Sequence, residues 1–262
     1  METNKTQIIA VANHKGGCGK TTTVVHLAAE LVECGKRVLI VDLDPQANVS
    51  LHIGKQHPSE ISITSAELLT HEENLLVDAL EEETNFKGVS LIYGSLNLGK
   101  TEDQLKEYSP RPNEELKYKL EPLFGIYDFI LIDCPPSLKI LTSNALAAAD
   151  HVIIPIESGS QYGLYGVTDL INHISKIHRI NPKLKLLGTL LIKHDKRQNV
   201  CKLIQDETNN TVGQLFETTI PTSTKVNQAA ILKQSLIDID KKSKIRLSFS
   251  ELANEILVKL ES

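Results

Sequence analysis

Short apolar runs alternate along the chain with longer stretches in which apolar residues recur every three or four positions. The short runs are rich in Ile, Val and Leu and lack the period-two alternation of a half-exposed sheet, which is typical of parallel strands buried on both faces. They predict strands at Gln7–Asn13, Arg37–Asp42, Val89–Tyr93, Tyr127–Asp133, His151–Pro155 and Leu186–Ile192.

The longer stretches predict helices at Lys20–Cys34, Leu141–Ala149, Tyr165–Ile177 and Ser250–Leu260. Alternation of strands and helices favours an α/β fold, with a mainly parallel central sheet and helices on both faces. The acidic stretch 54–123 is expected to hold short helices outside the main sheet. Since no repeat or low-complexity linker interrupts the pattern, residues 1–262 are predicted to form one domain.

Composition narrows the class of protein. The chain has 262 residues, of which 41% are hydrophobic and 23% charged, and this balance excludes intrinsic disorder. No apolar run approaches the roughly 18 residues of a membrane span, and no signal peptide is visible. The cysteines form no C-x-x-C pair, so neither a zinc site nor a disulfide framework is indicated, and a cytoplasmic protein is expected. They are Cys18, Cys34, Cys134 and Cys201.

A glycine-rich segment, His14–Thr22, joins a predicted strand to a predicted helix and reads His-Lys-Gly-Gly-Cys-Gly-Lys-Thr-Thr. In this position glycines and a helix N-terminus form a phosphate-binding loop, in which Lys20 contacts phosphates and the Thr21 hydroxyl binds Mg²⁺. The strict pattern requires glycine at His14, and instead a second lysine, Lys15, precedes the paired glycines. The alternatives are a chance glycine-rich turn and a dinucleotide-binding fingerprint, but G-x-G-x-x-G is absent.

Three aspartates, Asp42, Asp44 and Asp133, stand at or just beyond the ends of two predicted strands. Open α/β sheets bind ligands at the carboxyl edge of their strands, and carboxylates there hold Mg²⁺ directly or through water. A lone aspartate at such a place would be interpreted as a turn or helix cap. Three of them beside a phosphate loop favour a metal and catalytic site.

These motifs together resemble one family. Lys15–Thr22 is similar to the deviant P-loop of the ParA/MinD-type ATPases, and Val41–Asn48 and Ile130–Ser137 resemble the second and third ATPase motifs of its ParA/Soj branch. The resemblance covers Gln7 to Val167 well and the remainder more loosely. It implies a P-loop NTPase-like fold that binds ATP and Mg²⁺ and hydrolyses ATP weakly until a partner stimulates it.

The resemblance also implies a role for each matching residue. Asp44 would activate water, Asp42 and Asp133 would anchor Mg²⁺ with Thr21, and Lys15 would cross to the ATP of a second chain. The catalytic residues are then Lys15, Lys20 and Asp44. The nucleotide-binding residues are Lys15, Gly16, Gly17, Cys18, Gly19, Lys20, Thr21 and Thr22, with Pro221 near the adenine. Cys18 is interpreted as a small residue that fits the turn rather than as a reactive thiol.

The net charge of −5 conceals an asymmetry. Residues 1–172 carry 13 basic and 24 acidic residues, whereas residues 173–262 carry 15 basic and 9 acidic ones. A basic region by itself is ordinary solvated surface, but in ParA-type proteins such residues bind DNA phosphates. The DNA-binding candidates are Lys196, Arg197, Lys225, Lys241, Lys242, Lys244 and Arg246.

The resemblance implies an ATP-dependent homodimer that binds double-stranded DNA nonspecifically in the cytoplasm, on the nucleoid. A ParB-like centromere-binding protein would stimulate hydrolysis and release the dimer, which serves plasmid or chromosome partition. The chain leaves no room before Gln7 for the helix-turn-helix domain of longer plasmid-type members, so specific operator binding is not expected.

The main alternative is a MinD-like membrane ATPase, whose basic C-terminal helix binds lipid. Here residues 250–262 carry three Glu and one Lys, a charge unsuited to anionic lipid, so no membrane partner is expected. Iron–sulfur relatives would need a suitable cysteine pair, and a bacterial tyrosine kinase would need a C-terminal tyrosine cluster, whereas the last tyrosine is Tyr165. A non-enzymatic scaffold is disfavoured by the lysine, threonine and three aspartates of the motifs.

Overall fold

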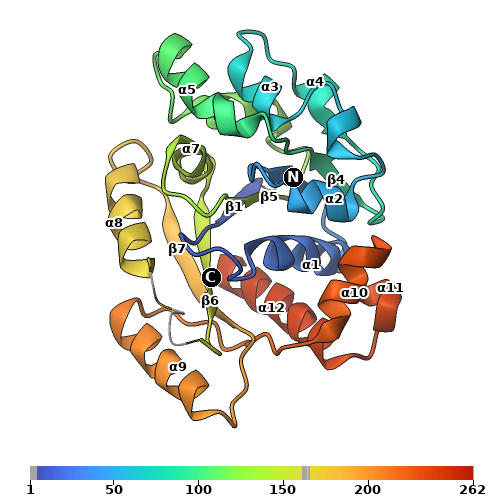
Figure 1. Cartoon of the computed structure of the whole chain (residues 1–262), viewed down its shortest axis with the longest axis vertical. Coiled ribbons are helices and arrows are strands. Elements are labelled where there is room, and N and C mark those ends of the chain that lie inside the picture. The colour runs from blue at the N-terminus through green and yellow to red at the C-terminus, as the bar shows by residue number, and fades with distance from the viewer. Residues whose placement is uncertain (1–4, 161–163, 165, 262) are drawn as a thin grey trace.

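A seven-stranded sheet forms the centre of the computed structural model within the residues that it describes, 5–160, 164 and 166–261 (Figure 1). The strand order is β3-β4-β2-β5-β1-β6-β7, and every neighbouring pair is parallel except β3 with β4. The predicted fold class, an α/β protein with a mainly parallel sheet, is confirmed. The strands are β1 (Gln7–Val11), β2 (Val38–Asp42), β3 (Leu80–Glu81), β4 (Val89–Ile92), β5 (Phe129–Asp133), β6 (His151–Glu157) and β7 (Lys185–Ile192).

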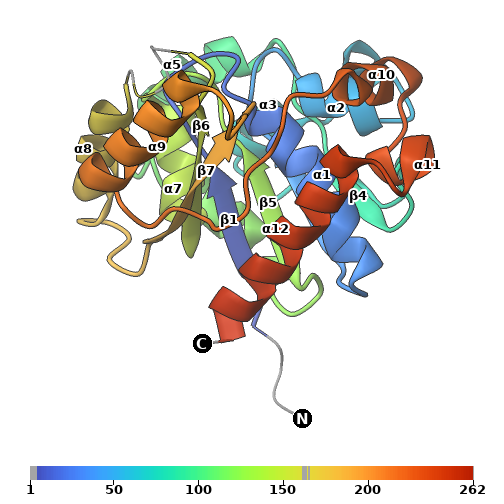
Figure 2. The ribbon, with the colours of Figure 1, turned by 90° about the horizontal axis from the view of Figure 1, so that it is seen from below.

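Helices cover both faces of the sheet (Figures 1 and 2). One face carries α3, α5, α6, α7 and α8, and the other carries α1 and α12, with α2, α10 and α11 beside them. The helices are α1 (Lys20–Glu33), α2 (Asn48–Ile53), α3 (Ser65–Thr70), α4 (Leu76–Ala79), α5 (Leu98–Tyr108), α6 (Glu115–Leu120), α7 (Ile140–Ala148), α8 (Val167–Ile177), α9 (Asn199–Thr211), α10 (Thr224–Leu232), α11 (Leu236–Asp240) and α12 (Lys244–Glu261).

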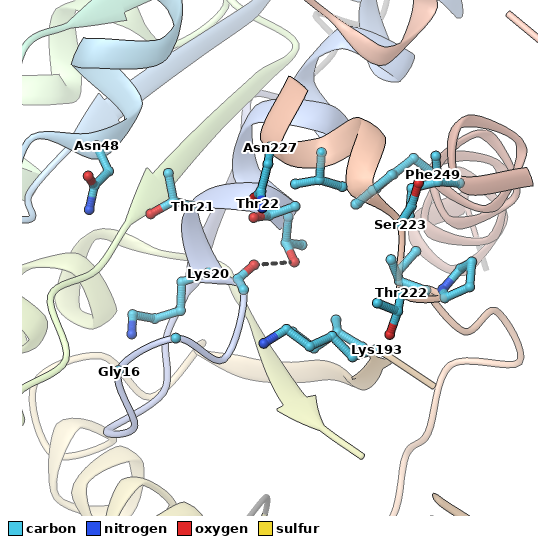
Figure 3. Close-up of a pocket in the computed structure, with 18 of the residues that line it drawn as sticks. Gly16, Lys20, Thr21, Thr22, Asn48, Lys193, Thr222, Ser223, Asn227 and Phe249 are labelled. Carbon is cyan, nitrogen blue, oxygen red and sulfur yellow. Dashed lines mark hydrogen bonds between the residues drawn. The ribbon is translucent and has the colours of Figure 1, made fainter. Parts of the chain in front are cut away.

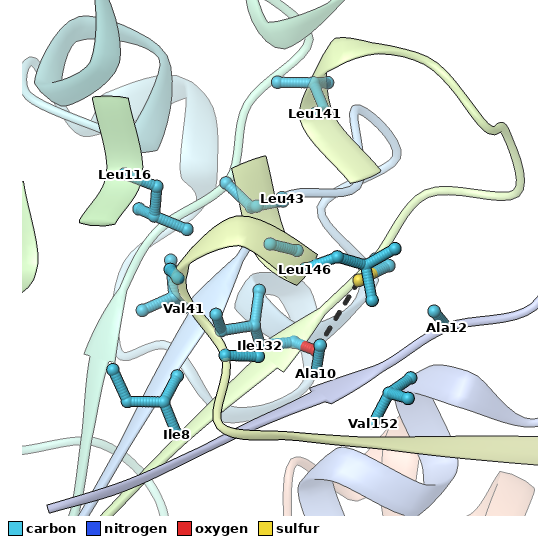
Figure 4. Close-up of a cluster of buried hydrophobic side chains, with 14 of the residues drawn as sticks. Ile8, Ala10, Ala12, Val41, Leu43, Leu116, Ile132, Leu141, Leu146 and Val152 are labelled. Atoms are coloured by element: carbon cyan, nitrogen blue, oxygen red, sulfur yellow. Dashed lines mark hydrogen bonds between the residues drawn. The ribbon is translucent and has the colours of Figure 1, made fainter. Parts of the chain in front are cut away.

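Successive residues of each central strand enter different cores because strand side chains alternate between the two faces. In β1, Ile8 and Ala10 belong to the core beneath α7, which Figure 4 shows, whereas Ile9 and Val11 pack against α1 and α12. Both cores are mainly aliphatic, although four Phe and one Tyr also contribute to the core that packs against α1 and α12. A strand that is buried on both sides needs apolar residues at every position, and this requirement explains its lack of alternation.

The three central strands end at one level. Asp133 of β5 is in register with Val11 of β1 on one side and with Asp42 of β2 on the other. The phosphate loop, which follows β1, therefore starts beside the two aspartates. The pairing of parallel strands thus brings together three motifs that are far apart in the sequence.

The six predicted strands are all present, but several other elements differ from prediction. The stretch 54–123 does hold short helices, yet it also supplies β3, which joins the edge of the sheet. Helices α9, α10 and α11 were not predicted, and α12 begins at Lys244 rather than at Ser250. The predicted start of the helix α8, Tyr165, lies outside the described residues.

No helix among the described residues combines the length and the apolar character that crossing a membrane requires.

Substitution of Gly188 tests the packing of the edge strand β7. An added Cβ would stand 2.6 Å from the ring of the buried Phe216. We expect Gly188→Ala to lower the free energy of unfolding by about 1–3 kcal/mol, the usual cost of overpacking. The measurement is urea unfolding. Gly99→Ala is the control, because this helical glycine has open space around its Cβ position and the change should be neutral or stabilise by up to about 1 kcal/mol. Equal stability of the Gly188 variant and the wild type would contradict the packing argument.

Candidate functional site

The loop between β1 and α1 has the conformation of an open phosphate cradle (Figure 3). Asn13 anchors its start, because the side chain donates to the Pro155 carbonyl at 2.7 Å and accepts from the Lys15 amide at 3.0 Å. Gly17 and Gly19 have φ of 73° and 80°, values that favour glycine. Around the Cβ positions of Gly16 and Gly17 there is no atom within 4 Å, so this side of the loop is accessible to a ligand.

The buried Lys20 and Cys18 both donate to the carbonyl of Lys15. The Lys20 ammonium and the Cys18 thiol each lie 3.1 Å from that oxygen. Burial raises the pKa of Cys18, although the Lys20 charge opposes the shift. A raised pKa favours the protonated thiol over the reactive thiolate.

Lys15 and Lys193 share one carboxylate. Glu157, the last residue of β6, accepts from the Lys15 ammonium at 3.0 Å and from the Lys193 ammonium at 2.8 Å. Burial acts to raise the pKa of Glu157, but the hydrogen bonds from Lys193 and Lys15 hold it below its usual range. The sequence analysis missed Glu157, since no local motif marks it.

Asp133 and Thr21 form the pair that a divalent cation would need. The Thr21 hydroxyl donates to one Asp133 oxygen at 2.7 Å, while the other oxygen is buried and has no hydrogen-bond partner. Burial raises the pKa of Asp133 well above its ordinary value, and the nearby Asp42 charge adds to the shift. An orphaned oxygen beside a second carboxylate fits Mg²⁺, because a cation would compensate both charges.

Asp42 is fully buried, and the chain itself occupies its oxygens. Ser50 donates to one oxygen from its amide at 3.0 Å and from its hydroxyl at 2.7 Å, and the Asp44 amide donates to the other at 3.1 Å. Burial raises the pKa of Asp42 to about 6, with these hydrogen bonds opposing the shift. Direct metal binding is therefore less suited to Asp42 than to Asp133. Ser50 was not recognised in the sequence analysis.

A cavity of about 570 Å³ opens above the phosphate loop (Figure 3). One end is formed by the loop with Thr21, Thr22 and Asp44, and the other by Pro221 and the residues after it. Pro221 lines the cavity, whereas Ile245 and Phe249 of α12, which also line it, were missed because α12 was predicted to begin at Ser250. The other missed lining residues are Thr23, Gln46, Asn48, Pro136, Ile192, Lys193, Ile220, Thr222, Ser223, Val226 and Asn227.

The structure separates the predicted DNA-binding residues into exposed and paired ones. Lys241, Lys242 and Lys244 are exposed at the start of α12, and no ion pair joins them to a described residue; Lys196 is exposed beyond β7 in the same way. Arg246, by contrast, donates to both carboxylate oxygens of Glu30 at 2.8 Å.

The Arg246 side chain is only 18% exposed, so its guanidinium is committed to this contact. Two other candidates are also paired, Lys225 with Asp240 and Arg197 with Asp195, and the Arg197 side chain remains 89% exposed. The lysines at the start of α12 are therefore the strongest candidates for contacts with phosphates.

The chain matches one family model and is similar to chromosome partitioning proteins. A family model described as an AAA domain matches residues 6–186. The chain is 35% identical to the chromosome partitioning protein ParA of Myxococcus xanthus, over 96% of the chain and 88% of the relative. It is 33% identical to the sporulation initiation inhibitor protein Soj of Bacillus subtilis, over 95% of the chain and 98% of the relative.

Two solved structures superpose on nearly the whole chain. Cobyrinic acid a,c-diamide synthase from Mycobacterium smegmatis, with a bound ATP analogue and magnesium, superposes with a TM-score of 0.85 at 32% identity, over 98% of the chain and 96% of that protein. The septum site-determining protein MinD from Pyrococcus horikoshii, in complex with Mg-ADP, gives a TM-score of 0.78 at 26% identity, over 98% and 99%.

Loss of the Ser50 hydroxyl should weaken the metal site. Ser50→Ala removes the 2.7 Å hydrogen bond to Asp42 and leaves the Gly94 amide, which donates to that hydroxyl, without its acceptor. We expect a higher half-saturating Mg²⁺ concentration in a nucleotide-binding titration and a free energy of unfolding lower by about 1–3 kcal/mol. Ser175→Ala, which removes a hydroxyl bonded to its own helix, is the control. A Ser50 variant that matched this control in both measurements would contradict the assignment.

Proposed function

Because the chain belongs to the family of the ParA and Soj chromosome partitioning proteins, we propose that it is a Mg²⁺-dependent ATPase that forms an ATP-bound homodimer on nonspecific DNA. The observation that carries the proposal is the cavity that joins the phosphate loop to Asp44 at one end and to Pro221 at the other. A nucleoside triphosphate has the matching polarity, with its phosphates at the loop and its base at the Pro221 end.

The chain's own groups account for nucleotide binding. Amides of the loop and the N-terminus of α1 would bind the phosphates, and Lys20 would exchange its bond to the Lys15 carbonyl for a phosphate oxygen. Mg²⁺ would be held by Thr21 and Asp133, with Asp42 contributing charge from the neighbouring strand. When bound, the ion neutralises charge on the phosphates.

Hydrolysis requires a group that orients water. Asp44 lines the cavity, and its position is fixed because one carboxylate oxygen accepts from the Gln46 amide at 3.0 Å. The remaining oxygen has capacity to accept from a water molecule at the phosphate end. In phosphoryl transfer such positioning and charge stabilisation provide most of the catalysis. Lys15 would supply the last positive charge from a second chain and so couple dimerisation to catalysis.

DNA would bind to the dimer through the exposed lysines at the start of α12. A dimer doubles the number of phosphate contacts, and each contact adds to affinity and to its salt dependence. We further propose that a ParB-like centromere-binding protein stimulates hydrolysis and releases the dimer from the nucleoid. The chain would in this way act as one cytoplasmic ATPase domain in plasmid or chromosome partition.

A MinD-like membrane ATPase is the second candidate, since MinD has a similar structure. The apolar side of α12 argues against it. Phe249, Leu252 and Ile256 are buried in the core that α12 shares with α1, so these side chains are not available to a lipid surface.

Co-sedimentation with DNA and with liposomes, each in ATP and in ADP, separates the two functions. We expect ATP-dependent pelleting with DNA that weakens steeply with salt, and no pelleting with anionic liposomes. Equal DNA binding in ADP and ATP would refute the ATP-dependent switch, and ATP-dependent pelleting with liposomes alone would support the membrane function instead.

Substitution of Lys15 and Asp44 separates dimerisation from hydrolysis. We expect Lys15→Ala to stay monomeric with ATP, because the charge that would reach the second chain is lost. Asp44→Ala should still dimerise but lose phosphate release by at least about a hundredfold, because the water is no longer positioned. Light scattering and a phosphate-release assay measure the two properties. A Lys15 variant that dimerises normally, or an Asp44 variant with normal turnover, would remove that residue from the mechanism.

Removal of the lysines at the start of α12 should weaken DNA binding. We expect Lys241→Ala/Lys242→Ala/Lys244→Ala to lower the slope of log affinity against log salt by about 0.9 for each phosphate that the variant can no longer neutralise. The charge-matched control replaces exposed lysines in the acidic half of the chain, Lys87, Lys100 and Lys106. Fluorescence anisotropy at several salt concentrations measures the slope, and equal slopes for the two triple variants would contradict the assignment.

A further inference from the structure

Lys15, which the proposed function assigns to the nucleotide of a second chain, already has an anionic partner within its own chain. We propose that Glu157 is a positioning residue that holds Lys15 within its own chain before dimerisation and releases it when a second chain presents its nucleotide. This inference rests on the proposed function, because it concerns the same lysine and the same dimer.

The fold brings Lys15 and Glu157 together. Strands β1 and β6 are parallel neighbours in which Val11 is in register with Ile153. Lys15 lies in the loop that follows β1, and Asn13 holds this loop against β6, because its side chain donates to the Pro155 carbonyl and accepts from the Lys15 amide. Their side chains are 22% and 19% exposed and the two charged atoms are 3.0 Å apart. The contact is therefore made by a loop that is anchored to β6 and a residue at the end of β6, rather than by two flexible surface groups.

Lys193 lowers the free-energy cost of separating Lys15 from Glu157. Glu157 is in register with Ile192, so the next residue of the chain, Lys193, stands on the other side of the carboxylate, with its ammonium at 2.8 Å. When Lys15 leaves, Glu157 keeps this second cation and no half-buried carboxylate is left unpaired. The group formed by one carboxylate and two ammonium ions has a net positive charge. This charge favours transfer of one lysine to a phosphate.

The size of the effect follows from the exposure of the pair. A partly exposed ion pair restrains its lysine only modestly, so removing the carboxylate should change an equilibrium about threefold to tenfold. Such a restraint disfavours contact with weak anions, yet a triphosphate easily outcompetes it. Glu157 would thus reduce unproductive pairing without preventing the ATP-bound dimer.

Chemical labelling tests the restraint without nucleotide and without a dimer. An amine-reactive ester labels a lysine in proportion to its free, neutral amine, and mass spectrometry gives the rate for Lys15. We expect Glu157→Gln to raise this rate about threefold to tenfold. Glu83→Gln is the matched control, because Glu83 pairs with Lys55 at 2.9 Å away from the site. An unchanged Lys15 rate in the Glu157 variant would overturn the proposal.

A second variant checks the role of Lys193. Lys193→Met leaves Glu157 with Lys15 as its single partner, so the labelling rate of Lys15 should fall below that of the wild type. A rise would overturn the proposal, because it would mean that Lys193 supports the contact rather than competing for it. Circular dichroism of both variants confirms that they are folded.

Dimerisation tests the functional consequence. With a slowly hydrolysed ATP analogue, the protein concentration at half-dimerisation should be about threefold to tenfold lower for Glu157→Gln than for the wild type. An equal or higher concentration would overturn the proposal. If labelling rises but neither protein dimerises with the analogue, the proposed function fails, and the release step fails with it. If the wild type dimerises and the variant changes neither assay, only this inference fails.

Discussion

The register of the three central strands is the constraint on which the site depends. Because β1, β5 and β2 end together, Asp42 and Asp133 are buried as neighbours directly below the start of the phosphate loop. Two adjacent buried carboxylates are costly unless protons, hydrogen-bond donors or a cation compensate them. Ser50 supplies donors to Asp42, and Thr21 supplies one to Asp133. A cation at the Asp133 oxygen that has no hydrogen-bond partner would compensate the rest of this buried charge.

The sequence predicted this part of the molecule because its determinants are local. A strand that is buried on both faces must be apolar throughout, and a phosphate loop must place glycines and Lys20 between such a strand and a helix. The three aspartates follow from the same logic, since they stand at or beyond strand ends. The central sheet, the loop and the carboxylates at the edge of the sheet could therefore be predicted from the sequence alone.

The remainder depends on contacts between distant segments, which a single sequence does not reveal. Glu157 pairs with Lys15 and Lys193, which follow two different strands of the sheet. The sequence shows Arg246 as a basic residue that could bind DNA, but not that Glu30 pairs with it. The C-terminal helix was predicted to begin at Ser250, yet it begins at Lys244, and its Phe249 lines the cavity. The two-residue β3 is too short for any periodicity to indicate. The sequence analysis missed these features because they depend on tertiary contacts.

The cavity joins segments that are far apart along the chain. Its phosphate end is built from residues 16–23, and its far end from residues 220–249. During synthesis the phosphate loop leaves the ribosome well before α12, since it precedes α12 by more than two hundred residues along the chain. A nascent chain therefore holds the loop without the wall that Ile245 and Phe249 of α12 contribute to the cavity. The cavity is complete only after α12 has been made, so a product that stopped before α12 would have the phosphate loop without this wall.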